Sequence, residues 1–184
     1  MNSNNPSEAY FPARAAFAKL VSAASLLLIF VGGVVTSHNA GLSVPDWPTS
    51  FGYHMWNMPF AMWKGGVFYE HSHRVLASII GLLVLLLAIW LGLEDRRRWL
   101  RLLGLASLGL VLLQGILGGL TVLHSLPIPV SVAHGVLAQL FFCTTLVVAY
   151  GLSRERATRL MDGDAGAAPG TVRAGAFRSE EHTS

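Results

Sequence analysis

Apolar residues run along this chain in four long stretches that are almost free of charge. Each stretch has about the ~20 residues that a helix needs to cross the hydrocarbon core of a bilayer. Only a helix satisfies all of its backbone hydrogen bonds inside lipid without closing into a barrel. The pattern therefore predicts an all-α integral membrane protein, a four-transmembrane-helix bundle over 17–152, with spans at about 17–37, 73–93, 101–123 and 130–152.

The polar segments between and around these spans set the organisation of the chain. A polar segment, 1–16, precedes the first span, and a tail rich in Gly, Ala and Arg, 153–184, follows the fourth. The longest connection, 38–72, is dense in proline, glycine and tryptophan, residues that interrupt regular elements or favour the headgroup layer. We expect it to lie on the bilayer or to cover a site at that face.

Composition and charge support this picture. With 53% hydrophobic and only 12% charged residues, the chain does not resemble an ordinary soluble domain. Its net charge of +3 depends on basic residues before the first span, between the second and third, and after the fourth. The positive-inside rule therefore places the N-terminus in the cytoplasm and the long connection outside, next to a lipid bilayer. Charge with this topological role argues against binding to nucleic acid.

Two histidines lie near the outer ends of two different spans. His73 opens the second span and His134 lies near the start of the fourth, and both spans run from outside to inside. At ~1.5 Å per residue the two imidazoles reach similar depths. Ionisable groups in membranes are functional by default, and helix bundles bind haem through such histidines. Alternatively, each histidine only hydrogen-bonds a neighbouring helix. The roles of His38, His54, His71 and His124 stay open, with interfacial hydrogen bonds expected for most of them.

Further polar groups accompany the pair. Glu70 lies one helical turn before His73, and Arg74 can pair with Glu70 or with an anionic group such as a haem propionate. A purely structural ion pair is the alternative. Gln114, in the third span, is expected to face the bundle interior because exposure to lipid would be costly. Gly115 and Gly119 form a G-x-x-x-G pair, which is typical of close helix packing.

Several segments together resemble the haem A synthase family. They are Gly32-Gly33, AGLSVPDWP (40–48), EHSHR (70–74), QGILGGLTV (114–122) and His134, in the family's order. The resemblance implies oxidation of a methyl group of haem O to the formyl group of haem A, for terminal oxidase assembly. It further implies His73 and His134 as metal ligands of the substrate haem, Glu70 as catalytic residue, and Arg74 and Gln114 as further cofactor-binding residues. Some members carry a cysteine pair in the first outer loop, whereas the single cysteine here, Cys143, lies in the fourth span.

The same resemblance implies that the chain is the N-terminal half of an eight-helix, pseudo-symmetric protein whose second half holds haem b. The last seven residues, 178–184, look like a translated sequencing adapter, so we expect the natural protein to continue and this fragment to be inactive alone. The expected location is the bacterial cytoplasmic (inner) membrane, with the site near the outer face. Expected partners are haem O synthase and terminal oxidase assembly factors. Whether the protein forms a homo-oligomer is left open by the sequence.

Two other functions remain compatible with the residues. One is a membrane b-type cytochrome that binds haem for electron transfer without modifying it. The other is a four-helix packing or assembly subunit without a cofactor.

Overall fold

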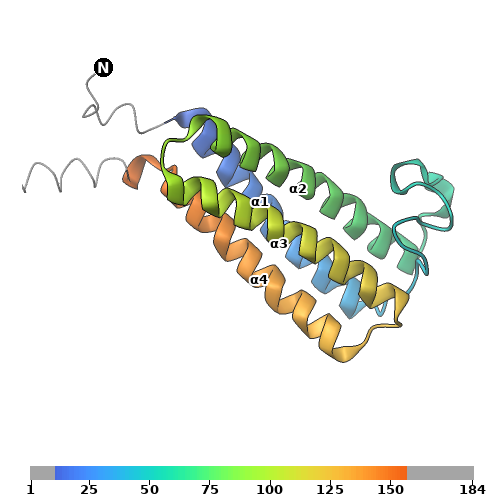
Figure 1. Ribbon diagram of the computed structural model, residues 1–184. Helices are drawn as coiled ribbons and strands as arrows, with labels where there is room; N and C mark the ends of the chain where they lie inside the picture. The colour runs from blue at the N-terminus through green and yellow to red at the C-terminus, as the bar shows by residue number, and fades with distance from the viewer. Residues whose placement is uncertain (1–10, 157–184) are drawn as a thin grey trace, which may run out of the picture.

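The computed structural model describes residues 11–156 (Figure 1). Four long helices make up most of this part: α1 (Pro12–Ser37), α2 (Gly66–Glu94), α3 (Arg98–Leu123) and α4 (Ile128–Gly151). All four are long and apolar enough to cross a membrane. The predicted all-α fold with four membrane helices is therefore confirmed, and the eight-helix architecture stays a prediction. The segment 1–10 and the tail from 157 on, with the adapter-like residues, lie outside the described residues.

The helices extend beyond the spans expected from hydropathy. Helix α2 begins at Gly66 rather than at 73, so Glu70, His73 and Arg74 lie well inside it. Hydropathy marks only the part of a helix that suits hydrocarbon, whereas the helix continues wherever its backbone groups are bonded. The connection before α2 is correspondingly shorter. We call residues 38–65 the outer loop, which contains two single turns of 3₁₀-helix, η2 (Met55–Asn57) and η3 (Phe60–Met62).

The four helices pack in a ring in chain order. Helix α1 contacts α2 and α4, and α3 contacts α2 and α4. Gly104 allows α3 to approach α2, because a side chain there would meet Leu91 and the backbone of Ala88. Consequently α2 and α4, which carry His73 and His134, lie diagonally in the bundle.

The fully buried apolar core fills only one half of this bundle. Its large members come from the parts of the helices far from the outer loop, namely Val21, Ile80, Val84, Leu87, Leu91, Leu100, Phe141 and Val148. Among the described residues, the helical segments nearer the outer loop contribute Val35 as their one buried aliphatic side chain. Among the described residues, the half of the bundle that holds the histidine pair therefore has few fully buried aliphatic side chains.

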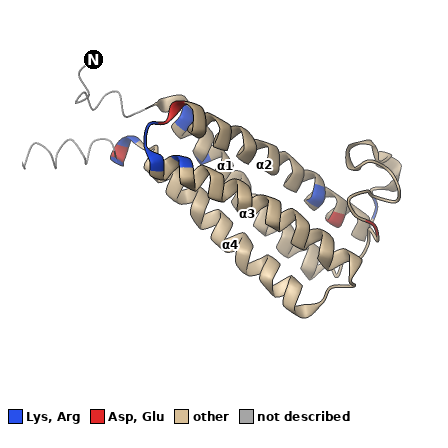
Figure 2. Ribbon diagram, in the orientation of Figure 1, with Lys and Arg blue, Asp and Glu red and all other residues tan. Residues whose placement is uncertain are grey.

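The two ends of the bundle differ in charge. Figure 2 shows most Lys and Arg positions at the end where α1 begins and α4 ends, which we call the basic end. The outer loop and the α3–α4 connection lie at the other end, here called the loop end (Figure 1). The predicted orientation in the membrane, with the N-terminus in the cytoplasm, depends on this difference in charge between the two ends.

A buried charge network joins three elements at the basic end. Asp95 pairs with Arg14 of α1 at 3.4 Å and with Arg97 at 2.7 Å, and Arg97 also donates to the carbonyl of Gly151 at the end of α4. Burial disfavours the charge of Asp95, but hydrogen bonds and charge from Arg97, and the charge of Arg14, hold its pKa below its ordinary value. Asp95 therefore remains ionised and stabilises the positions of the arginines.

Candidate functional site

His73 and His134 lie in the half of the bundle next to the outer loop. They come from the diagonal helices α2 and α4, and a charge on one ring would act on the other. The Nδ1 atom of each ring is buried without a hydrogen-bond partner. A buried polar atom without a partner costs free energy in a folded protein, so such atoms commonly mark functional sites. Two such imidazoles lie on the diagonal helices α2 and α4, and His71 Nε2, Arg14 Nε and Ser131 Oγ are also buried without a partner.

Each of these imidazoles lies against a glycine of a neighbouring helix. A Cβ on Gly32 of α1 would lie 3.1 Å from Cε1 of His73. A Cβ on Gly118 of α3 would lie 3.4 Å from Cε1 of His134. Gly32 therefore limits how closely the His73 ring can approach α1, whereas a Cβ on Gly118 would make an ordinary van der Waals contact with His134.

Gln114 faces the bundle interior and contacts the backbone of the second histidine. Its Nε2 donates to the carbonyl of His134 at 3.0 Å. The backbone carbonyl of Gln114 also lies close to the His134 ring, although no hydrogen bond of regular geometry joins it to Nδ1. In the structure Gln114 thus fixes α4 at His134.

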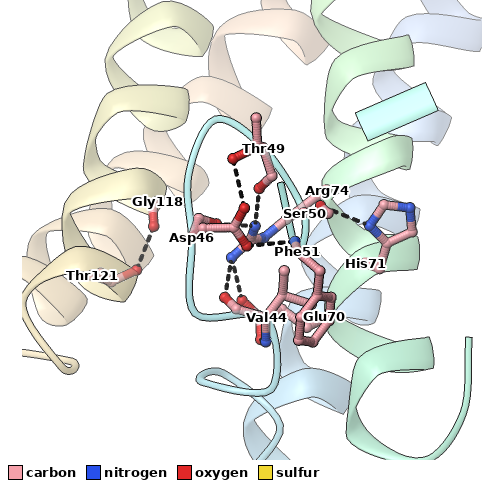
Figure 3. A network of polar contacts seen from close by, with 10 residues as sticks. All are labelled: Val44, Asp46, Thr49, Ser50, Phe51, Glu70, His71, Arg74, Gly118 and Thr121. Carbon is pink, nitrogen blue, oxygen red and sulfur yellow. Dashed lines mark hydrogen bonds and ion pairs between the residues drawn. The ribbon is translucent and has the colours of Figure 1, made fainter. Parts of the chain in front are cut away.

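Glu70 and Arg74 form a buried ion pair that holds the outer loop (Figure 3). Arg74 Nη2 lies 2.6 Å from Glu70 Oε1, and Glu70 Oε2 accepts from the amide of Val44 at 2.8 Å. Arg74 also donates to the loop carbonyls of Val44 (2.8 Å), Asp46 (2.6 Å) and Thr49 (3.2 Å). Of the two partners expected for Arg74, the structure shows the carboxylate, and its guanidinium is used by the loop.

Asp46 organises the part of the loop that Arg74 holds. Its carboxylate accepts from the hydroxyl of Thr49 (2.5 Å) and from the amides of Phe51 (2.7 Å) and Gly52 (2.9 Å). Phe51 and Gly52 both have left-handed φ values, 52° and 76°, so these bonds stabilise a turn that is otherwise strained. Burial opposes the charge of Asp46, but the bonds from Gly52, Thr49 and Phe51 outweigh it and hold its pKa below the ordinary value.

His71 forms a third attachment between α2 and the loop. Its side chain is fully buried, its Nδ1 lies 3.0 Å from the hydroxyl of Ser50, and its ring meets the edge of Trp63 at 4.5 Å between centroids. Sequence reasoning left His71 without a role, because the partners that bury it are 21 and 8 positions away and no periodicity relates them. In the structure it helps to fix the loop.

Trp47 attaches the loop to α3 on the opposite side. A Cβ on Gly119 would lie 2.6 Å and 2.8 Å from ring atoms of Trp47, so only glycine leaves room for the indole. Within residues 11–156, the two glycines of the predicted G-x-x-x-G pair do not pack against another helix: Gly119 receives an indole from the loop, and a Cβ on Gly115 would meet nothing within 4 Å. A close approach between α3 and α2 occurs instead at Gly104.

The other histidines make local contacts at the loop end. The ring of His38 stacks on Tyr69, with centroids 4.2 Å apart. His54 accepts from the amide of Trp56 and thereby caps η2. His124 lies 3.2 Å from the carbonyl of Leu120, one turn earlier in its own helix. None of these three contacts reaches the histidine pair.

Comparison with known proteins agrees with this arrangement. Residues 15–176 match the model of the family described as cytochrome oxidase assembly protein (COX15-CtaA). This match covers most of the chain. The chain belongs to the haem A synthase family.

Individual relatives carry that name. Haem A synthases of Listeria monocytogenes and Listeria welshimeri are each 28% identical over 136 residues, covering 73% of this chain and 43% of theirs. A haem A synthase–mitochondrial ferredoxin fusion protein of Schizosaccharomyces pombe is 33% identical over 124 residues, covering 53% of this chain and 20% of its own. The chain thus spans less than half the length of these relatives. No solved structure matches it.

Membership of the family implies that haem is involved, and the histidine pair fits such a group. Two imidazoles with unpartnered buried nitrogens are a donor set suited to iron in a porphyrin. Within residues 11–156 no group of three or more His, Cys, Asp or Glu side chains is placed to hold a metal ion. His73 and His134 are accordingly the residues that would hold a haem.

Proposed function

We propose that this chain is the part of a haem A synthase that binds haem O for oxidation of a porphyrin methyl group to the formyl group of haem A. The observation that carries this proposal is the unpartnered pair His73 and His134, in the half of the bundle where few aliphatic side chains are fully buried. Family membership supports the substrate and the reaction. The haem iron would supply the oxidation chemistry when the group is bound.

The proposal gives each polar group of the site a task. His73 and His134 would ligate the iron, and Gln114 would keep His134 in place through the backbone contact at 3.0 Å. Glu70 and Arg74 would hold the outer loop next to the site. Assistance by Glu70 in the oxidation, or a contact from Arg74 to a haem propionate, would require them to exchange a bond that they now make to each other or to the loop.

The charge distribution supports a location for the site. The basic end of the bundle would face the cytoplasm of a bacterial inner membrane, so the histidine pair would lie toward the outer face. We propose haem O synthase as the source of the substrate and terminal oxidase assembly as the destination of the product.

Haem extraction from cells tests this function. The full-length gene is expressed in a strain that lacks its own haem A synthase, and haem A is expected to appear. His73→Ala and His134→Ala should each abolish haem A, whereas the matched control His124→Ala, at an exposed position of the same end, should leave it unchanged. If the protein binds haem but no haem A forms, the proposed synthase activity is wrong, and the result indicates a membrane b-type cytochrome. Haem A formed by both alanine variants would contradict the ligand assignment.

A further inference from the structure

The outer loop is attached on both sides of the histidine pair by residues that neighbour the site. Arg74, which holds three loop carbonyls, directly follows His73 in α2. On the other side, Trp47 packs against Gly119 of α3. Gly119 directly follows Gly118, which lies against the ring of His134. The loop segment 44–50 therefore reaches from the α2 side of the site to the α3 side.

The two attachments differ in kind. The α2 attachment consists of charge-assisted hydrogen bonds within a buried network, which are among the stronger polar contacts in proteins (Figure 3). The α3 attachment consists of one aromatic ring that lies against the bare backbone of a glycine. An indole offers a large, rigid apolar surface, and close carbon contacts over that surface add up to a substantial attraction. Without the indole, the loop would keep its polar attachment to α2, its contact with α1 through the amide of Ala40, and the contact of Gly41 with Leu126.

We infer that Trp47, seated on Gly119, is a positioning residue that keeps the outer loop closed over the site of His73 and His134 and thereby sets the position of the substrate haem. This inference rests on the proposed function for its haem part, whereas the seating of Trp47 is independent of it. The indole acts through the loop and through the α3 segment that carries Gly118. It therefore needs no ligand contact of its own.

Two glycines of α3 provide a matched pair of variants. Gly119→Ala places a methyl group inside the space of the indole and should displace it, whereas Gly115→Ala makes the same chemical change one turn earlier, where nothing lies within 4 Å. Trp47→Ala removes the ring itself. In the Trp47→Ala background, Gly119→Ala should have no further effect, because the atoms it would meet are gone.

A single reporter thiol measures the loop without reference to haem. Val44, in the outer loop itself, is fully buried, so Val44→Cys should be protected from a water-soluble maleimide in full-length protein whose exposed Cys143 is replaced by alanine. We expect Gly119→Ala and Trp47→Ala to raise the labelling rate about tenfold or more, since overpacking or loss of the ring shifts the loop toward open states. Gly115→Ala should leave it unchanged. Equal labelling rates in Gly119→Ala and Gly115→Ala would show that the packing of Trp47 against Gly119 does not hold the loop.

Extracted haem from the same variants, made without the reporter substitutions, tests the positioning role. Gly119→Ala should lower the ratio of haem A to haem O about fivefold or more while the histidine-ligated haem spectrum is retained, and Gly115→Ala should not. Faster labelling with an unchanged haem ratio would overturn the positioning role and leave only a structural contact. Absence of haem A in the wild-type protein would overturn the proposed function and the positioning role with it. The labelling result would still show whether Trp47 packs against Gly119 and holds the loop.

Discussion

His73 of α2 lies with its Cε1 edge against Gly32 of α1, where a methyl group would come within 3.1 Å of the ring. Neighbouring Gly33 would place a Cβ in open space, with nothing within 4 Å. Two adjacent glycines therefore have different tasks. The first determines how closely an imidazole can approach α1, and the second has no neighbour that requires glycine.

This difference predicts the outcome of two alanine variants in the full-length protein. Gly32→Ala should shift the His73 ring by a few tenths of an ångström and change the absorption and EPR spectra of the bound haem, because axial imidazole orientation tunes haem iron. Gly33→Ala, the same change one residue later, should leave both spectra as in the wild type. Identical spectra for the two variants would show that Gly32 does not set the ring position.

Glu70→Gln should separate haem binding from turnover. The substitution keeps the size of the side chain but removes the charge that pairs with Arg74 at 2.6 Å and offers an amide where an acceptor is needed. We expect haem to stay bound through His73 and His134, while haem A formation falls about tenfold or more as the charge-assisted bonds weaken. The ratio of haem A to total haem measures this. Turnover at the wild-type rate would show that the charge of Glu70 is not needed for haem A formation.

Asp95→Asn should destabilise the bundle at its basic end. Arg14 is 2% exposed and Asp95 is a counter-charge for it, so neutralisation leaves a buried cation poorly compensated, at a cost of about 3 kcal/mol. Glu94→Gln is the control, because Glu94 is exposed and bonds Trp90, and its change should stay within about 0.5 kcal/mol. Thermal unfolding in detergent compares the two. Equal midpoints would mean that Arg14 finds another partner.

Acid should loosen the outer loop through Asp46. Its folded-state pKa lies below the ordinary value of 3.8, so its stabilising contribution is fully present above that value and is lost as the pH falls through the lowered folded-state pKa. Hydrogen exchange at the amides of Phe51 and Gly52, which donate to Asp46, should therefore accelerate below about pH 4 relative to an Asp46→Asn variant measured at the same pH. The variant corrects for the intrinsic pH dependence of exchange. Parallel pH profiles for the two proteins would contradict this role.

Hydropathy and residue spacing predicted the membrane helices and the contact between Glu70 and Arg74. The four apolar stretches specify four membrane helices, because lipid leaves the backbone no other way to satisfy its hydrogen bonds. The spacing of Glu70 and Arg74 predicted a pair on one helix face, and the ion pair at 2.6 Å agrees with it. Both inferences concern residues within one helix, where spacing alone determines neighbours.

Contacts between distant segments lay beyond this reasoning. His71 bonds Ser50, and Gly119 receives Trp47 from a loop that precedes it by more than seventy positions. A G-x-x-x-G spacing is the same whether a helix or an indole occupies the groove, so the sequence could not tell them apart. The sequence by itself determined the membrane helices, their family and the histidine pair, since these depend on local composition and order. Only the tertiary structure decided which residues attach the outer loop to α2 and α3, because close approach between segments far apart in the chain depends on the packing of the whole bundle.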